Sequence, residues 1–133
     1  MILEKEIPGD TAFVAPLTVR TVDFLVRRGL IEEDSRERMQ LCLTEALRNA
    51  VLHGNRGEFS KRVVLRVFTT SKEWGMLIED EGDGFDWEAV PDPLESEGVW
   101  GESGRGLRIL RHYMDRVEHY AGGTAVLLTA SRK

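Results

Sequence analysis

The spacing of apolar residues along the first part of the chain predicts a strand followed by a helix. Residues 2–7 alternate apolar and charged side chains and stop at a Pro-Gly pair, which is typical of a short, half-buried edge strand that ends in a turn. From Thr11 the apolar residues recur at helical intervals. Gly29 follows the last of them, where a C-cap glycine is expected, so we predict that the helix ends there.

The second predicted helix has the clearest pattern in the sequence. Asp34 followed three residues later by Glu37 predicts a capping-box start, and the helical spacing continues to about His53, before Gly54 stops it. Five apolar residues share one face of this helix and predict its core stripe: Met39, Leu43, Ala46, Leu47 and Ala50.

The rest of the chain predicts an antiparallel hairpin, a long loop, a third helix and two final strands. Residues 61–70 and 74–80 are rich in Val, Leu, Phe and Ile, with a polar turn between them. Residues 83–103 are polar and lack a sustained period, which predicts a long loop or lid. The remaining elements follow in order: a helix from Gly104 to about Met114, then strands at 117–120 and 124–129 joined through Gly122 and Gly123.

This order of elements predicts one α/β (α+β) domain that covers residues 1–133. We expect a two-layer sandwich in which a mostly antiparallel, mixed sheet carries helices on one face.

Composition and charge then narrow the class of protein. Hydrophobic residues make up 41% and charged residues 31%, an ordinary balance for a soluble domain, and no apolar run is long enough to cross a membrane. A net charge of −5 without a Lys/Arg stripe argues against a nucleic-acid partner. Cys42 is the only cysteine, and the first residues lack the apolar region of a secretory signal. We therefore predict a cytoplasmic protein whose partner is another protein or a small molecule.

The first group of candidate functional residues lies on the second predicted helix. Glu45, Asn49 and His53 line up on the face opposite the core stripe. A carboxylate can accept a proton from an attacking hydroxyl or water, and an amide oxygen can ligate Mg²⁺. Taken alone, the segment is accounted for more simply by an ordinary solvated helix face.

A second candidate is the Gly-x-Gly turn that follows Asp80 at the end of a predicted strand. Gly82 and Gly84 permit close approach of a ligand, while the Asp80 carboxylate can accept a hydrogen bond from an exocyclic amine such as that of adenine. A Ca²⁺ loop does not fit, because its third position is Gly82 and its twelfth is Pro91. A tight turn at the end of a strand accounts equally well for this segment alone.

The third candidate is the glycine-bearing start of the third predicted helix. Gly104, Arg105 and Gly106 stand where free backbone N–H groups favour an anion such as phosphate. Taken alone, this segment is accounted for more simply by a flexible helix entry. No Gly-Lys-Ser/Thr follows a strand, which excludes the common phosphate loop, and no Cys or His has the spacing of zinc ligands.

Together these segments resemble the GHKL ATPase superfamily, which includes gyrase, heat-shock chaperone, histidine kinase and mismatch-repair ATPases. The short length and the form Thr-Glu-Ala-x-x-Asn-Ala-x-x-His-Gly are most similar to the anti-sigma-factor serine kinases of bacteria. Four segments carry the resemblance: residues 44–54 for the N box, 80–85 for the G1 box, 104–107 for the G2 box, and 123–124 for the late Gly-Thr strand start.

The resemblance implies a site for ATP and Mg²⁺. In it, Glu45 is the general base, Asn49 ligates Mg²⁺ between the phosphates, and Asp80 holds the adenine amino group. The remaining roles are implied in the same way: Gly82 and Gly84 shape the adenine pocket, Gly104, Arg105 and Gly106 reach the phosphates, and Thr124 stands near Asp80 and the base. The chain departs from the family pattern at Glu102, where relatives often carry a basic residue.

The activity that the resemblance implies is that of an ATP-dependent serine/threonine protein kinase. Its substrate would be a STAS-domain anti-anti-sigma protein, with a sigma factor as a further partner and a homodimer as a further state. The alternative is a non-catalytic ATP-binding module that regulates by nucleotide-dependent protein contact, against which the retained Glu45 argues. A sensor histidine kinase is disfavoured, because the chain has no room for a phosphoacceptor hairpin ahead of residue 44.

Overall fold

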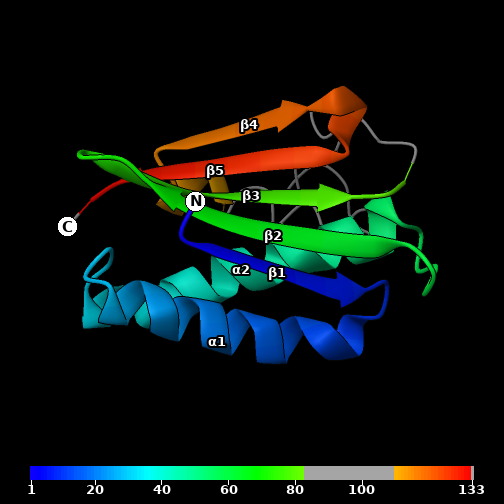
Figure 1. The fold of residues 1–133 in the computed structure, drawn as a ribbon, viewed down its shortest axis with the longest axis horizontal. Helices are drawn as coiled ribbons and strands as arrows, with labels where there is room; N and C mark the ends of the chain where they lie inside the picture. The colour runs from blue at the N-terminus through cyan, green and yellow to red at the C-terminus, as the bar shows by residue number, and fades with distance from the viewer. Residues whose placement is uncertain (83–109, 133) are drawn as a thin grey trace.

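The computed structural model describes residues 1–82 and 110–132. Its strands form one five-stranded sheet in the order β1-β2-β3-β5-β4, and every pair of neighbours is antiparallel (Figure 1). The described sheet therefore lacks the parallel pair that a mixed sheet requires. The strands are β1 (Leu3–Pro8), β2 (Arg62–Thr69), β3 (Glu73–Asp80), β4 (Arg116–Tyr120) and β5 (Ala125–Ser131).

Two long helices lie together on one side of the sheet (Figure 1). Helix α1 (Val14–Arg27) follows a 3-10 turn, η1 (Thr11–Phe13), and helix α2 (Arg36–Asn49) follows a second one, η2 (Glu33–Ser35). A π-helical turn, η3 (Ala50–Gly54), continues α2 directly, and a short 3-10 turn, η5 (Ala121–Gly123), joins β4 to β5. No described helix has the length and apolar character needed to cross a membrane.

The start of α2 differs from the prediction. Asp34 lies inside η2, and the N-cap of α2 is Ser35, which makes no side-chain capping hydrogen bond. The predicted capping box is therefore wrong, because a 3-10 turn supplies the first helical turn and α2 begins two residues later. The predicted end of α1 is confirmed, since Gly29 follows it with φ of 70°.

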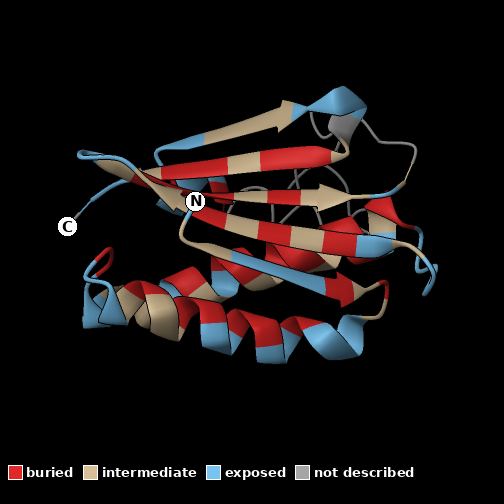
Figure 2. Cartoon of the chain, in the orientation of Figure 1, coloured by how far each residue is buried: buried red, intermediate tan, exposed pale blue. Residues whose placement is uncertain are grey.

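The core lies between the two helices and the inner face of the sheet (Figure 2). The predicted stripe of α2 is confirmed, because all five of its residues are buried: Met39, Leu43, Ala46, Leu47 and Ala50. Facing it, Val63, Leu65 and Val67 of β2 are fully buried, while the alternate residues of that strand are less so. This packing holds α2 and η3 against the middle of the sheet, where β3 ends at Asp80.

Candidate functional site

The end of η3 lies directly against the end of β3. A Cβ added to Gly54 would lie 2.2 Å from Oδ2 of Asp80, and one added to Gly82 would lie 1.7 Å from the carbonyl oxygen of Gly54. A side chain at Gly82 is therefore excluded by the backbone of Gly54, whereas one at Gly54 would force the Asp80 carboxylate to move. The segments that the sequence singled out around residues 53 and 80 are thus brought together, and the absence of side chains at both glycines allows this approach.

Asp80 is the charged group at this junction. Its Oδ1 accepts a hydrogen bond of 2.8 Å from the backbone N–H of Gly82, and the side chain is partly buried. Burial raises the pKa of the Asp80 carboxyl, against the opposing effects of the Gly82 hydrogen bond and the positive charge of Lys61. The second oxygen, Oδ2, packs against Gly54, and the carboxylate remains a hydrogen-bond acceptor at this junction.

Glu45 and Asn49 lie one helical turn apart on α2 and are both buried, with exposed fractions of 7% and 3%. A solvated helix face, which was the simpler interpretation of this segment alone, is therefore wrong for Glu45 and Asn49. A carboxylate and an amide are rarely buried without a polar role, because removing them from water is costly. Their oxygens are the hard ligands and proton acceptors that phosphoryl chemistry uses.

His53, the third polar residue of this helix face, is partly buried. Burial lowers the pKa of its imidazole, and the positive charge of Arg48 lowers it further. His53 is therefore neutral at pH 7 and adds no positive charge to the site. Burial likewise raises the pKa of the Cys42 thiol to about 12, so this cysteine is no nucleophile at neutral pH.

Thr124 lies beside Asp80, as the sequence led us to expect. Its backbone carbonyl accepts a hydrogen bond of 2.8 Å from the backbone N–H of Asp80, which ties the start of β5 to the end of β3. The Thr124 hydroxyl itself donates to the carbonyl of Ala121 at 3.0 Å. The backbone of Thr124 thus positions Asp80, while its hydroxyl is engaged within the η5 turn.

The histidine kinase-like ATPase domain model matches residues 7–130 of the chain. The chain belongs to the histidine kinase-like ATPase family. Solved structures agree in fold: the catalytic domain of histidine kinase ThkA has a TM-score of 0.57 and 13% identity, covering 98% of this chain and 97% of that one. The mycobacterial sensor histidine kinase MprB has a TM-score of 0.56 and 15% identity, covering 98% and 99%.

Sequence relatives of this histidine kinase-like ATPase domain include proteins named as a serine-protein kinase and as anti-sigma factors. Serine-protein kinase RsbW of Bacillus subtilis is 24% identical over 133 residues, which cover 94% of this chain and 82% of the relative. Anti-sigma F factor of Oceanobacillus iheyensis is 30% identical over 101 residues, which cover 72% and 69%. The predicted resemblance to this family and type is confirmed.

Asn55 is a site-forming residue that sequence reasoning missed. It is fully buried, its amide nitrogen donates to the carbonyl of Arg62 at 3.0 Å, and its amide oxygen accepts from the backbone N–H of Glu81 at 2.8 Å. One side chain thus clamps the start of β2 to the turn after Asp80. Its place directly after Gly54 was the available signal, because an asparagine at the end of a helix can bond to backbone groups that the turn leaves unpaired.

Four predicted site residues lie outside the described part of the chain: Gly84, Gly104, Arg105 and Gly106. Glu102, the predicted loop at 83–103 and the start of the third predicted helix lie there too. Only the last turn of that helix, at residues 110–113, is described.

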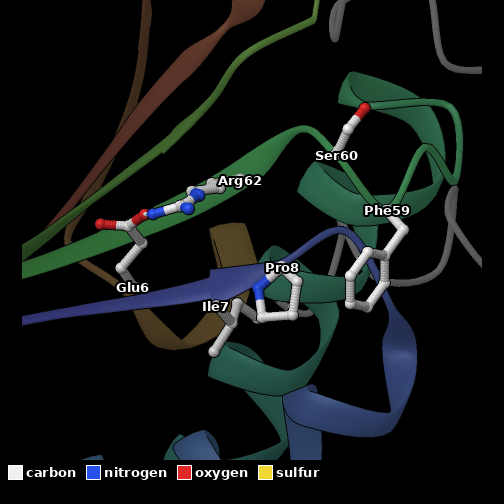
Figure 3. Close-up of a pocket in the computed structure, with 6 residues that line it drawn as sticks. All are labelled: Glu6, Ile7, Pro8, Phe59, Ser60 and Arg62. Atoms are coloured by element: carbon white, nitrogen blue, oxygen red, sulfur yellow. Dashed lines mark hydrogen bonds and ion pairs between the residues drawn. The ribbon is translucent and has the colours of Figure 1, made fainter.

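Clefts lined by described residues lie away from the candidate site. One of about 530 Å³ lies where β1 ends and β2 begins, and in it the side chains of Glu6 and Arg62 point toward one another as an ion pair (Figure 3). Phe59 stands beside Pro8 at the other end of this cleft (Figure 3). Another, of about 380 Å³, lies between β1 and α1. Neither includes Glu45, Asn49 or Asp80.

Proposed function

We propose that this domain is an ATP-dependent serine/threonine protein kinase of the anti-sigma regulatory type. It binds Mg-ATP beside the contact between η3 and the end of β3 and phosphorylates a STAS-domain anti-anti-sigma protein, with a sigma factor as a further partner. The burial of Glu45 and Asn49 on the helix that leads into the contact between Gly54 and Asp80 is the observation that carries this proposal. The names of its relatives, serine-protein kinase and anti-sigma F factor, support the choice of activity.

The Asp80 carboxylate can hold an adenine. Gly54 and Gly82 carry no side chains where they contact each other and Asp80, so a flat base can approach the backbone beside this contact closely. The carboxylate can accept the exocyclic N–H of adenine, while Gly82 donates to its Oδ1. The backbone of Thr124 holds Asp80 in place.

The donors on α2 fit a magnesium ion bound mainly by the nucleotide. The described residues contain no group of three or more His, Cys, Asp or Glu side chains that could hold a metal. Mg²⁺ commonly takes only one or two protein ligands and draws the rest from phosphates and water, and the amide oxygen of Asn49 suits that role. When bound, the ion neutralises charge on the phosphates.

Glu45 is then the proton acceptor. Its carboxylate lies one turn before Asn49 and accepts the proton of the substrate hydroxyl as the phosphoryl group is transferred. Phosphoryl transfer depends chiefly on positioning and charge neutralisation, so a buried, well-packed helix is a suitable base for both groups. Gly84, Gly104, Arg105 and Gly106 complete the proposed nucleotide site.

The test is phosphotransfer by the wild-type chain and by Glu45→Gln. The protein is incubated with Mg-ATP and a STAS-domain protein encoded nearby, and phosphoserine or phosphothreonine is measured by mass spectrometry. Glu45→Gln should lower the rate by about a hundredfold or more, because only the proton acceptor is removed, while calorimetric titration shows nearly unchanged ATP affinity.

Glu37→Gln is the matched control, because Glu37 is an exposed glutamate on the same helix and the chemical change is identical. It should leave both rate and affinity unchanged. Tight ATP binding by the wild type without any transfer would instead favour a non-catalytic module that regulates by nucleotide-dependent contact. Equal loss of binding and transfer in Glu45→Gln would contradict the role of Glu45 as base.

A further inference from the structure

A further cleft, of about 290 Å³, lies at the end of the sheet opposite to Asp80, where β3 begins and β5 ends (Figure 1). Four of the residues that line it are buried apolar residues of the core: Leu30, Ile31, Met39 and Trp74. They come from the segment after α1, from α2 and from β3. The cleft therefore has an apolar floor that is continuous with the core.

The exposed residues that line this cleft are polar or aromatic: Glu32, Tyr113, Asp115 and Ser131. Oδ2 of Asp115 accepts hydrogen bonds from the backbone N–H of Ser131 at 2.7 Å and from its hydroxyl at 3.0 Å. These bonds fix the Asp115 side chain, while its other oxygen, Oδ1, receives no hydrogen bond from any residue that the structure describes.

Glu32 and Asp115 are the two charged side chains among the described residues that line the cleft. Neither forms an ion pair within residues 1–82 and 110–132. An apolar floor with two unpaired carboxylates beside it is complementary to a side chain that is apolar along its length and positively charged at its end.

Arg38 lies next to the cleft without lining it. Its Nη2 donates to the Ser35 hydroxyl at 3.0 Å, and its guanidinium carbon lies 5.8 Å from the centroid of the Tyr113 ring. One positive charge thus stands against the two carboxylates of the cleft, and acids remain in excess. Three other arginines at this end of the domain bond elsewhere: Arg36 to Glu33 and Asp23, Arg116 to Glu73, and Arg132 to the carbonyl of Thr70.

The size of the cleft suits one side chain better than a whole small molecule. Sites for small molecules commonly have volumes of about 300–1,000 Å³ and enclose most of the ligand, whereas this cleft is smaller and has exposed walls. Arginine is a frequent anchor in protein interfaces. Its planar guanidinium has five N–H donors and can therefore serve two carboxylates at once.

We propose that this cleft binds an arginine side chain from an exposed segment of a partner protein. The guanidinium donates to Glu32 and to Oδ1 of Asp115, and the aliphatic stem packs on the Tyr113 ring and the apolar floor. The site is separate from the phosphotransfer proposed above, because none of Glu45, Asn49 and Asp80 lines the cleft.

The basic residue after β5 is a poorer occupant. The backbone N–H of Arg132 donates to the carbonyl of Lys72 at 2.9 Å, and its Nη1 donates to the carbonyl of Thr70 at 2.9 Å. Both bonds hold Arg132 at the turn between β2 and β3, so its side chain does not reach the carboxylates of the cleft.

The test is an NMR titration of the full chain, without nucleotide and at about 0.15 M salt, which limits long-range charge effects. The probe is an N-acetylated, C-terminally amidated peptide, Ser-Ala-Arg-Ala-Ser. The methyl resonances of Ile31, Met39 and Ala130 report binding, because these residues line the cleft. We expect a dissociation constant of about 1 mM, as for one anchor on a flexible peptide. The same peptide with neutral citrulline in place of Arg should bind at least about fivefold more weakly.

The double variant Glu32→Gln, Asp115→Asn should weaken binding of the arginine peptide at least about fivefold and should no longer distinguish arginine from citrulline. The amide oxygen at position 115 can still accept from Ser131, so the fold is retained. Asp34→Asn, Glu37→Gln is the matched control, because both are exposed acids close to Glu32 in the chain that do not line the cleft. It should bind as the wild type does.

Shifts confined to the cleft, together with this pattern of affinities, support the proposal. It is overturned by no shift up to about 10 mM peptide, by equal affinity for the citrulline peptide, or by equal weakening in the two double variants. It is also overturned if dilution of the chain without peptide shifts the same methyl resonances, because a second copy then fills the cleft.

Discussion

At the scale of single residues, folding disfavours the ionised form of the Asp80 carboxyl. Because its pKa in the folded protein is raised above the ordinary 3.8, the folded protein binds this proton more tightly than the unfolded chain does. The contribution of Asp80 to stability is therefore greatest below pH 3.8, and it falls as the pH rises through 3.8 toward the folded pKa. At pH 7 the ionised carboxylate destabilises the fold, which is common for a binding residue.

Asp80→Asn should accordingly raise the melting temperature at pH 7, and the gain should shrink below pH 4. The same variant should bind Mg-ATP at least about tenfold more weakly, because it loses a charged hydrogen-bond acceptor. Scanning calorimetry at both pH values and calorimetric titration with ATP provide the measurements. Glu79→Gln, the adjacent carboxyl on the other face of β3, should show neither effect. A lower melting temperature for Asp80→Asn at pH 7 would contradict this account.

Gly54→Ala tests the close contact between η3 and β3. The new Cβ would collide with the Asp80 carboxylate, so we expect a loss of about 1–3 kcal/mol in the free energy of unfolding and a marked loss of ATP affinity. Gly57→Ala is the control, because its Cβ meets open space but its φ of 72° is strained for alanine. It should lose stability without losing ATP affinity. If Gly54→Ala and Gly57→Ala bind ATP with equal affinity, the nucleotide does not bind beside the contact between Gly54 and Asp80.

At the scale of elements, the site depends on how α2 ends. The π-helical turn η3 continues α2 by five residues and brings Gly54 to Asp80. A π-turn is wider than an α-turn, which changes the direction in which the following residues point, and such turns are frequent at functional sites. Asn55 then fixes the position of η3 against the sheet, because its side chain forms hydrogen bonds to both β2 and the turn after β3.

Asn55→Ala should therefore destabilise the protein by about 2 kcal/mol or more, because it leaves a backbone carbonyl and a backbone N–H without their partner at a buried position. Urea unfolding followed by circular dichroism gives the value. Arg56→Ala is the control, since Arg56 is its exposed neighbour and should change stability by less than about 0.5 kcal/mol. Similar losses for the two variants would mean that the Asn55 clamp contributes nothing.

At the scale of the whole molecule, nucleotide binding should stabilise the fold because it joins α2, η3, β3 and β5. At Mg-ATP concentrations of about 100 times the dissociation constant, the expected gain is about 2.7 kcal/mol, or about 10 °C in melting temperature. Mg²⁺ alone should have little effect, because the described residues offer no cluster of three metal-binding side chains. An equal shift with Mg²⁺ alone would indicate a metal site independent of the nucleotide.

The sequence pattern predicted the described strands and the core stripe of α2 correctly. Both depend on local periodicity: alternation places Val63, Leu65 and Val67 on one face of β2, and helical spacing does the same for the stripe of α2. The capping box at Asp34 was wrong, because local capping signals do not distinguish a 3-10 turn from the first turn of an α-helix. The roles of Glu45, Asn49 and Asp80 stay predictions, although their burial and neighbours agree with them.

Sequence alone thus determined the order of elements and which residues face the core, because each follows from neighbours within a few positions. It also determined which family the motifs resemble, because the resemblance depends on the order and spacing of motifs along the chain. Only the tertiary structure decided that Gly54 touches Asp80 and that Asn55 joins β2 to the turn after β3. These features depend on distances between residues far apart in the chain, and no local period encodes such distances. Long-range packing of α2 and α1 against the sheet therefore converts separate motifs into a site.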